Sequence, residues 1–141
     1  MIILSVVAAV GIVLLVLCRS SIERSLLFYP SHRPGDNGLA PWIGDGEIIG
    51  YCRKIGSPKN VWLMLHGNGG QASDRAYAFQ SFSLEDSVFI LEYPGYGGRE
   101  GVLSKETFNR AAKEAYLLLR KEYPKIPVCV VGESLGSGPA S

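Results

Sequence analysis

One serine of this chain has the sequence surroundings of a catalytic nucleophile. The pentapeptide GESLG at residues 132–136 matches the pattern G-x-S-x-G and directly follows the apolar run 128–131. On a strand-to-helix turn, two such glycines permit a sharp bend that exposes the hydroxyl of the central serine. That geometry and a nearby base make a serine hydroxyl an effective nucleophile. The pattern predicts Ser134 as a nucleophile, against the alternative of an ordinary glycine-rich turn, and Ser137 lacks the same spacing.

A second glycine-rich segment, HGNGG at residues 66–70, follows the apolar run 61–65. Loops between a strand and a helix can supply backbone N–H groups to an oxyanion hole, which binds the negative charge that develops on a carbonyl oxygen. Leu135, the residue after the nucleophile, would supply another donor, and each donor is worth roughly 10² to 10³ in rate. His66 could act as a general base, but its place beside the loop favours a structural role in holding that loop by hydrogen bonds.

The remaining polar candidates have weaker support. His32 lies in a stretch rich in proline and glycine that predicts a linker. The segment EYPGYGG at residues 92–98 predicts a turn-rich loop, whose tyrosines either line a pocket or cover the end of the sheet. Glu133 is interpreted as part of the packing around the turn rather than as a catalytic acid.

The first glycine loop also fits a different class of site. Residues 67–72, GNGGQA, match G-x-G-x-x-G/A, and Glu92 follows about 20 residues later, where a ribose-binding acid would stand. This hypothesis predicts a dinucleotide-binding domain. It leaves Ser134 unexplained, and it expects the loop after the first strand, whereas residues 47–54 already predict an earlier strand. It is the less favoured alternative.

Composition narrows the classes of partner. The 141 residues fit one domain, with 47% hydrophobic residues, 19% charged residues and a net charge of +1. There is no run of Lys or Arg, so nucleic acid is not expected as a partner.

The three cysteines lie far apart and form no C-x-x-C pair, so neither a disulfide framework nor a metal site is predicted, and no cofactor is expected. Cys129 is expected to be a small buried side chain. No oligomeric state is predicted.

The amino-terminal residues predict a membrane anchor. Residues 2–17 are apolar except for Ser5 and Gly11, near the lower end of the roughly 17–25 residues that a transmembrane helix needs. No basic residue precedes the run and no A-x-A site follows it, which favours an uncleaved single-pass anchor at 1–18 over a signal peptide. Arginines follow the anchor, so the positive-inside rule places the rest of the chain on the cytoplasmic side.

Apolar periodicity predicts an α/β domain at residues 46–141, joined to the anchor by a juxtamembrane segment and linker at 19–45. Strands are expected at 47–54, 61–65, 87–91 and 128–131, and helices at 73–82 and 104–123. The first helix would turn Ala76, Phe79 and Phe82 inward, and Ser104 and Thr107 are candidate N-caps of the second helix. Alternating strands and helices predict a parallel sheet with right-handed crossovers.

The motifs at 66–70, 92–97 and 132–136, in this order, resemble the α/β-hydrolase superfamily. With the anchor and the sequence LFYP at 27–30, the chain is similar to the membrane-anchored branch, which also resembles serine aminopeptidase-type hydrolases and includes lipid and acyl-protein esterases. The resemblance implies Ser134 as nucleophile and the backbone N–H groups of Asn68 and Leu135 as the oxyanion hole. It implies a small-molecule, lipid or acyl ester as substrate, and an acid and a histidine further along the chain.

The chain departs from that family pattern after the nucleophile. Ser141 is the last residue, so the implied acid and histidine are absent, and a hydrolase domain truncated after the elbow is expected. Loss of a triad's general base can cost about 10⁶ in turnover, so the chain is expected to be inactive by itself. The run 128–131 would form an open sheet edge, which favours aggregation. The alternative hypothesis is a non-catalytic truncated product that acts through its anchor or by pairing with another chain.

Overall fold

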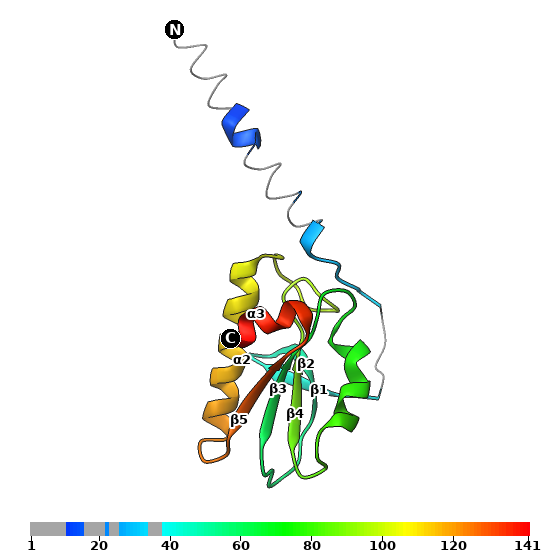
Figure 1. The fold of residues 1–141 in the computed structure, drawn as a ribbon, viewed down its shortest axis with the longest axis vertical. Coiled ribbons are helices and arrows are strands. Elements are labelled where there is room, and N and C mark those ends of the chain that lie inside the picture. Colours follow the sequence, from blue (N-terminus) through cyan, green and yellow to red (C-terminus); the bar gives the residue numbers. More distant parts are fainter. Residues whose placement is uncertain (1–10, 16–21, 23–25, 34–37) are drawn as a thin grey trace.

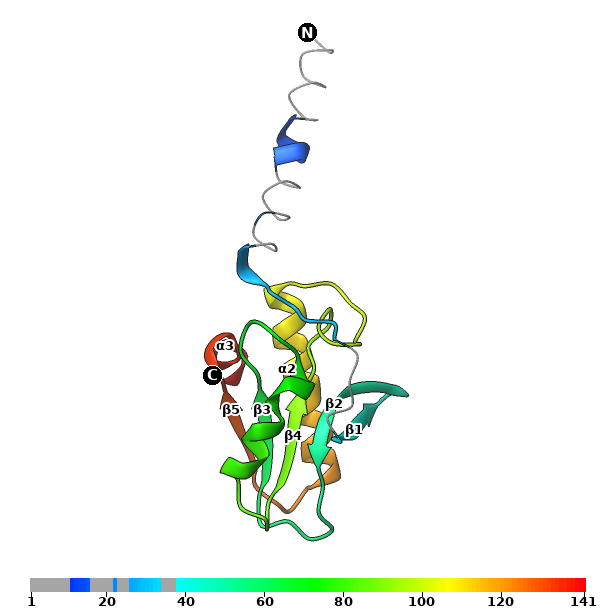
Figure 2. The same ribbon diagram turned by 90° about the vertical axis from the view of Figure 1, so that its right-hand side faces the viewer.

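The described part of the chain forms a layered α/β domain around one sheet. The computed structural model describes residues 11–15, 22, 26–33 and 38–141. The sheet has five strands in the order β1-β2-β4-β3-β5. The strands are Ala40–Gly44 (β1), Glu47–Arg53 (β2), Val61–Leu65 (β3), Ser87–Leu91 (β4) and Val128–Gly132 (β5). Helix α2, Lys105–Glu122, and the 3-10 helix η1, Ala72–Ser81, cover opposite faces of the sheet (Figures 1 and 2).

Strand pairing is mixed, rather than parallel throughout as the sequence predicts. Strand β3 pairs in parallel with both β4 and β5, whereas β2 pairs antiparallel with both β1 and β4. Residues 40–44, expected to lie in the linker, form β1 at one edge of the sheet. An edge strand tolerates Pro41 because a proline there does not interrupt a ladder on both sides.

The predicted strands at 61–65 and 87–91 have the observed bounds, and the other two agree within one residue. The continuous burial of β3 and β4 explains this agreement, because strands buried on both faces are written as unbroken apolar runs. Strand β5 lies at the other edge of the described sheet, as predicted. Cys129, expected to be buried, is only partly buried, because β5 is paired on one side alone.

Of the two N-cap candidates, Ser104 caps helix α2, and Thr107 is the third residue of the helix. The Ser104 side chain accepts a hydrogen bond from the Thr107 backbone N–H, and Thr107 accepts one in return from the Ser104 backbone N–H, at 3.1 Å each. This reciprocal pair is a capping box, which satisfies donors that the first helical turn leaves unpaired. The buried face of α2, led by Phe108 and Leu119, packs on the sheet as part of the main core.

The helix predicted at 73–82 differs from the structure in type. It is the 3-10 helix η1, with a kink at Arg75 (φ −100°, ψ 19°). Its buried residues include Ala72, Arg75 and Ala78, at the three-residue spacing of a 3-10 turn. Of the residues predicted to face inward, Phe79 and Phe82 are partly buried and pack against the smaller core cluster, and Ala76 is partly buried. The register is set by Arg75, whose charged end turns into the protein toward a partner described below.

The predicted anchor at 1–18 lies mostly outside the described residues, which include only 11–15 of it, in helical conformation. Within the described ranges, no helix combines the length and the apolar character that a membrane crossing requires. Several described apolar side chains that precede the domain are exposed to solvent, among them Ile22, Leu26 and Leu27, whereas Phe28 packs against the main core.

Candidate active site

Ser134 lies directly after β5, as the first residue of the short 3-10 helix η2, Ser134–Gly136. Its φ angle is 49°, in the left-handed region, and its side chain is exposed. A residue with a β-carbon pays about 1–2 kcal/mol to adopt that conformation, so the surrounding structure must impose it. The structure therefore presents the hydroxyl that the sequence singles out on a strained strand-to-helix turn.

Both glycines of the elbow are required by close backbone contacts. A β-carbon on Gly132 would clash with the Ser137 backbone and the Gly136 carbonyl oxygen. A β-carbon on Gly136 would clash with the Leu65 carbonyl oxygen and would lie 2.8 Å from that of His66. The turn therefore packs directly on the end of β3, and this contact holds Ser134 in its strained conformation.

The elbow and the first glycine loop lie side by side at the carboxyl ends of β5 and β3. The backbone N–H of Glu133 donates to the Leu65 carbonyl oxygen at 2.9 Å. The Glu133 carboxylate accepts a hydrogen bond from the backbone N–H of Gly67 at 3.3 Å. The tertiary structure thus brings together the two segments that were predicted to carry the nucleophile and the oxyanion donors.

A partly buried ion pair reinforces this junction. Arg75 Nε donates to Glu133 Oε2 at 3.0 Å, and Arg75 Nη2 donates to the Gly69 carbonyl oxygen at 2.9 Å. The Arg75 side chain is 11% exposed and that of Glu133 is 38% exposed. Glu133 therefore has the packing role expected of it. The role of Arg75 was not predicted from the sequence, because its partner Glu133 lies 58 residues away along the chain and no local pattern relates the two residues.

His66 lies beneath the loop rather than in front of it. Its side chain is 0% exposed. Nδ1 donates to the Gly67 carbonyl oxygen at 2.8 Å, and the ring lies 4.6 Å from that of Tyr93, centroid to centroid. Nε2 is 3.3 Å from Glu92 Oε1, an ion-pair distance, but the contact lacks hydrogen-bond geometry. A ring enclosed in this way can hold the loop and has no route to a bound substrate.

Glu92 caps the start of η1 instead of facing solvent. Its two carboxylate oxygens accept hydrogen bonds from the Ala72 backbone N–H, at 3.1 and 3.0 Å, and the residue is 3% exposed. A dinucleotide would need this helix start for its pyrophosphate and a free acid for its ribose. Here the acid itself occupies the helix start, so the geometry does not favour the dinucleotide-binding hypothesis.

The tyrosines of the 92–98 loop cover the end of the sheet. Tyr93 stacks on Phe108 with ring centroids 4.0 Å apart, and its hydroxyl donates to the His66 carbonyl oxygen at 3.2 Å. The Tyr96 hydroxyl donates to Asn68 Oδ1 at 2.9 Å. Burial raises the pKa of Tyr93 well above its usual range and raises the pKa of Tyr96 to about 12. Both hydroxyls are therefore neutral donors at physiological pH.

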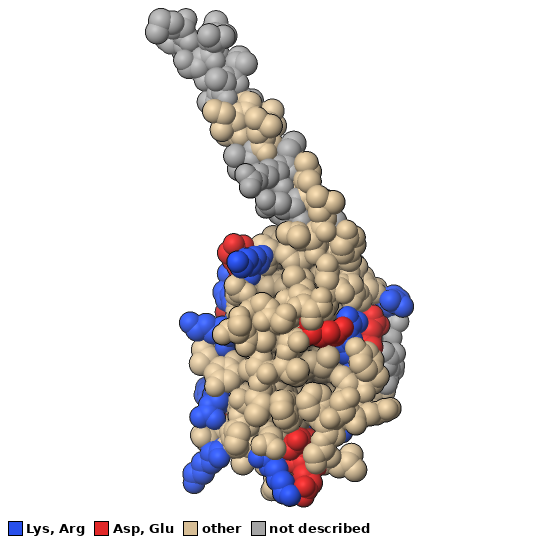
Figure 3. Space-filling view, viewed as in Figure 1, with Lys and Arg blue, Asp and Glu red and all other residues tan. Residues whose placement is uncertain are grey.

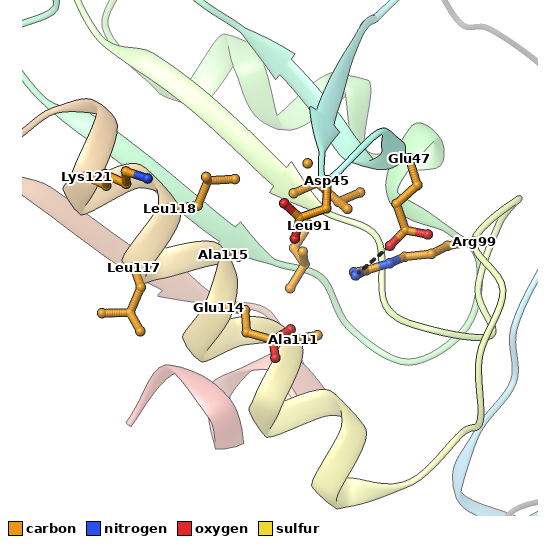
Figure 4. A pocket seen from close by; sticks show the side chains of 12 residues that line it. Asp45, Glu47, Leu91, Arg99, Ala111, Glu114, Ala115, Leu117, Leu118 and Lys121 are labelled. Atoms are coloured by element: carbon orange, nitrogen blue, oxygen red, sulfur yellow. Dashed lines mark hydrogen bonds and ion pairs between the residues drawn. The ribbon is translucent and has the colours of Figure 1, made fainter.

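An apolar cavity of about 430 Å³ adjoins the elbow at Leu135. Its lining includes Leu27, Phe28, Phe108 and Pro139. A separate cavity of about 370 Å³ lies between the β1–β2 turn and α2, with the Arg99–Glu47 ion pair at its rim (Figure 4). No residue of the elbow or of the first glycine loop lines this second cavity.

On the face shown in Figure 3, charged side chains lie mainly at the margins and form no patch of one sign.

These features define an α/β protein that presents one exposed serine on a strained turn, beside a glycine-rich loop that follows a parallel strand. Ser134, Leu135 and Asn68 all lie at this end of the sheet. The described residues contain no group of three or more side chains arranged to hold a metal ion.

No family model matches the chain. The monoglyceride lipases of Mus musculus and Rattus norvegicus are 28% and 29% identical to it over 102 residues, which cover 65% of this chain and 33% of each relative. The alpha/beta hydrolase domain-containing protein aho-3 of Caenorhabditis elegans is 32% identical over 83 residues, covering 55% of this chain and 25% of that protein. The chain thus spans a third or less of the curated relatives it matches. These similarities support the α/β-hydrolase superfamily.

Proposed function

We propose that this chain carries the nucleophile and the oxyanion hole of a serine hydrolase, which transfers an acyl group from an ester, thioester or amide to water. The observation that carries the proposal is the φ angle of 49° at Ser134, imposed between two glycines that cannot bear a β-carbon. Strain at a single exposed hydroxyl is the mark of a residue held for chemistry rather than for packing.

In the proposed reaction, Ser134 Oγ attacks the substrate carbonyl carbon and passes its proton to a general base. The carbonyl π electrons move to the oxygen, where the backbone N–H groups of Asn68 and Leu135 bind the new negative charge. Collapse of this intermediate breaks the bond to the leaving group, which takes the proton from the base, and forms an acyl-serine. Water then attacks the acyl carbon by the same route and frees the hydroxyl. The hydrogen bond between Glu133 and Leu65 supports this assignment, because it keeps the two donor segments adjacent.

The general base is expected from a histidine outside these 141 residues. The sequence contains two histidines. His66 is enclosed beneath the glycine loop, and the His32 ring is bound at the Gly97 carbonyl oxygen, with Nδ1 at 2.8 Å. The resemblance to the superfamily implies that the histidine and its acid partner follow the nucleophile in the chain order.

We propose a lipid or another acyl ester as the substrate and a membrane as the place of action. The relatives named monoglyceride lipase and the apolar cavity at Leu135 support the substrate class. The exposed apolar side chains Ile22, Leu26 and Leu27 support contact with lipid through a single-pass anchor at 1–18, with the domain on the cytoplasmic side. Residues 26–33 join the domain at the same end as α3, Ser137–Ala140, next to the elbow (Figure 1).

Chemical rescue tests the proposal on the 141-residue chain. A fluorophosphonate probe is added with and without imidazole, which can act as a diffusible general base for an exposed hydroxyl. We expect imidazole to accelerate labelling at Ser134, as mapped by peptide mass spectrometry, and Ser134→Ala to remove both the labelling and the imidazole effect.

Ser137→Ala is the matched control, because Ser137 lies in the next turn and its hydroxyl donates to the Ser134 carbonyl oxygen. It should keep the labelled site. Labelling that maps to Ser137, or an imidazole response that survives Ser134→Ala, would contradict the assignment of the nucleophile. No response in the wild-type chain would favour the non-catalytic alternative.

A further inference from the structure

Residues 27–33, here called the strap, lie across the two loops beside the elbow. The backbone N–H of Ser31 donates to the Gly70 carbonyl oxygen at 2.9 Å. The Ser31 carbonyl oxygen accepts from the Gly97 backbone N–H at 2.8 Å, and Pro30 forms a parallel bridge with Gly70. The strap therefore pairs by its backbone with the 66–70 loop and the 92–98 loop at once.

One amide side chain connects the strap to the loop that carries the proposed oxyanion donor. Asn68 Oδ1 accepts hydrogen bonds from the Tyr29 backbone N–H at 2.9 Å, the Gly69 backbone N–H at 3.1 Å and the Tyr96 hydroxyl at 2.9 Å. Asn68 Nδ2 donates to the Leu27 carbonyl oxygen at 2.5 Å. The amide offers an acceptor oxygen and a separate donor nitrogen on one short side chain, so neither Asp nor Leu reproduces this set of bonds.

A second amide repeats the arrangement at the other end of the strap. The Arg33 backbone N–H donates to Gln71 Oε1, and Gln71 Nε2 donates to the Arg33 carbonyl oxygen, at 3.0 Å each. Gln71 is 3% exposed. The strap thus binds this part of the chain at Asn68, at Gly70 and at Gln71.

The glycine loop needs such support for a physical reason. Glycine loses more conformational freedom on folding than any other residue, and a segment with three glycines in five residues has little intrinsic preference for one shape. An oxyanion donor contributes to catalysis only if its N–H already points at the position where charge develops. Several of the hydrogen bonds that order this loop are made by the side chain of Asn68, the residue whose own backbone N–H is the proposed donor.

We propose that Asn68 and the strap are positioning elements of the site: the side chain of Asn68 binds residues 27–29 so that its backbone N–H is held in place for the oxyanion. This inference rests on the proposed function. The segment that follows the predicted anchor then belongs to the site. A substitution at residues 27–33 should therefore alter the reactivity of Ser134, although these residues do not contact the substrate.

The test combines amide hydrogen exchange with imidazole-supported fluorophosphonate labelling on the full 141-residue chain. Asn68→Ala should accelerate exchange of the Tyr29 and Gly69 amides at least tenfold. It should also slow labelling at Ser134 by about 10-fold or more, toward the loss expected for one oxyanion donor. Asn68→Asp keeps an acceptor but loses the Nδ2 donor, so both effects should be intermediate. Gln80→Ala, an exposed amide truncated on η1, is the matched control and should leave both readouts unchanged.

The two readouts separate the possible failures. Unchanged exchange at Tyr29 and Gly69 in a folded Asn68→Ala chain would show that this side chain does not hold the strap. Faster exchange with an unchanged labelling rate would reduce the strap to a structural feature and overturn the positioning role. If imidazole does not activate even the wild-type chain, the proposed function fails and the positioning role falls with it, while exchange still decides whether Asn68 holds the strap.

Discussion

The two glycine-rich turns that would share the oxyanion hole are held in place by different forces. The elbow at 132–136 is fixed by shape, since its glycines contact the end of β3 too closely for any β-carbon. The loop at 66–70 is fixed by hydrogen bonds, from Asn68 and His66 within it and from Arg75 outside it. An added methyl group should therefore disrupt the elbow, whereas the loss of a polar side-chain atom should disrupt the loop.

The largest effect is expected at the elbow. In Gly136→Ala, the new β-carbon would overlap the Leu65 carbonyl oxygen, so the turn must move away from β3. We expect a loss of more than about 3 kcal/mol in the free energy of unfolding, measured by urea denaturation and circular dichroism. Gly138→Ala is the control, because a β-carbon there meets nothing within 4 Å. If the two variants were equally stable, steric fit would not be what holds the elbow.

A smaller but clear effect is expected at the ion pair that joins the two turns. Glu133→Ala leaves the largely buried Arg75 guanidinium without its carboxylate, at a cost of about 1–3 kcal/mol. Arg75→Met should cost less, since the remaining Glu133 carboxylate is more exposed and can be hydrated. Urea denaturation of both variants measures this asymmetry. The reverse order would mean that Glu133, not Arg75, is the partner that depends on the pair.

The strain at Ser134 predicts a gain in stability. Glycine adopts a φ of 49° without the penalty of a β-carbon, so Ser134→Gly should be about 1 kcal/mol more stable than Ser134→Ala. Both variants lack the hydroxyl, which makes them a matched pair for thermal denaturation, and both should lose probe labelling. Equal stability would indicate that the left-handed conformation is not imposed on residue 134 in solution.

The smallest expected effect is on the free energy of unfolding at alkaline pH. It comes from Tyr96, whose hydroxyl binds Asn68 in the 66–70 loop and not the elbow. Burial raises the pKa of Tyr96 to about 12 in the folded chain, above the value of about 10 expected for an unfolded tyrosine. The unfolded chain therefore loses its proton first, so this contribution to stability is complete below about pH 10 and declines as the pH rises toward 12.

Urea denaturation at about pH 9 and about pH 10.5 measures this decline, and it should be shallower in Tyr96→Phe because one titrating group has been removed. The substitution also deletes the hydroxyl that donates to Asn68 Oδ1, so its stability is compared with that of wild type at each pH separately. An equal decline in both chains would assign the alkaline sensitivity to other groups, such as Tyr93.

Several elements could be predicted from local sequence because each has a local cause. Strands β3 and β4 are continuous apolar runs, and α2 begins at a serine that forms a capping box three residues on. The elbow could be predicted for the same reason, since its glycines and its serine lie within five residues. The curated relatives agree with the hydrolase part of that interpretation, while the roles of Ser134, Asn68 and Leu135 stay predictions.

The features that sequence reasoning missed depend on partners far along the chain. Strand β1 contains a proline in a stretch typical of a linker, and it is a strand only because β2 pairs with it. The buried face of η1 follows Arg75, which turns toward Glu133 in the elbow. The side chain of Asn68 belongs to a motif that was recognised, yet its bond to Leu27 spans 41 residues.

The sequence by itself determined which segments become strands and helices and where the glycine-rich turns lie, because apolar periodicity, glycine spacing and capping act over a few residues. The tertiary structure alone decided the strand order, the side of η1 that is buried and the partners that hold the glycine loop. Those depend on which distant groups can satisfy a buried guanidinium or a loop amide, and that is settled only when the segments pack together.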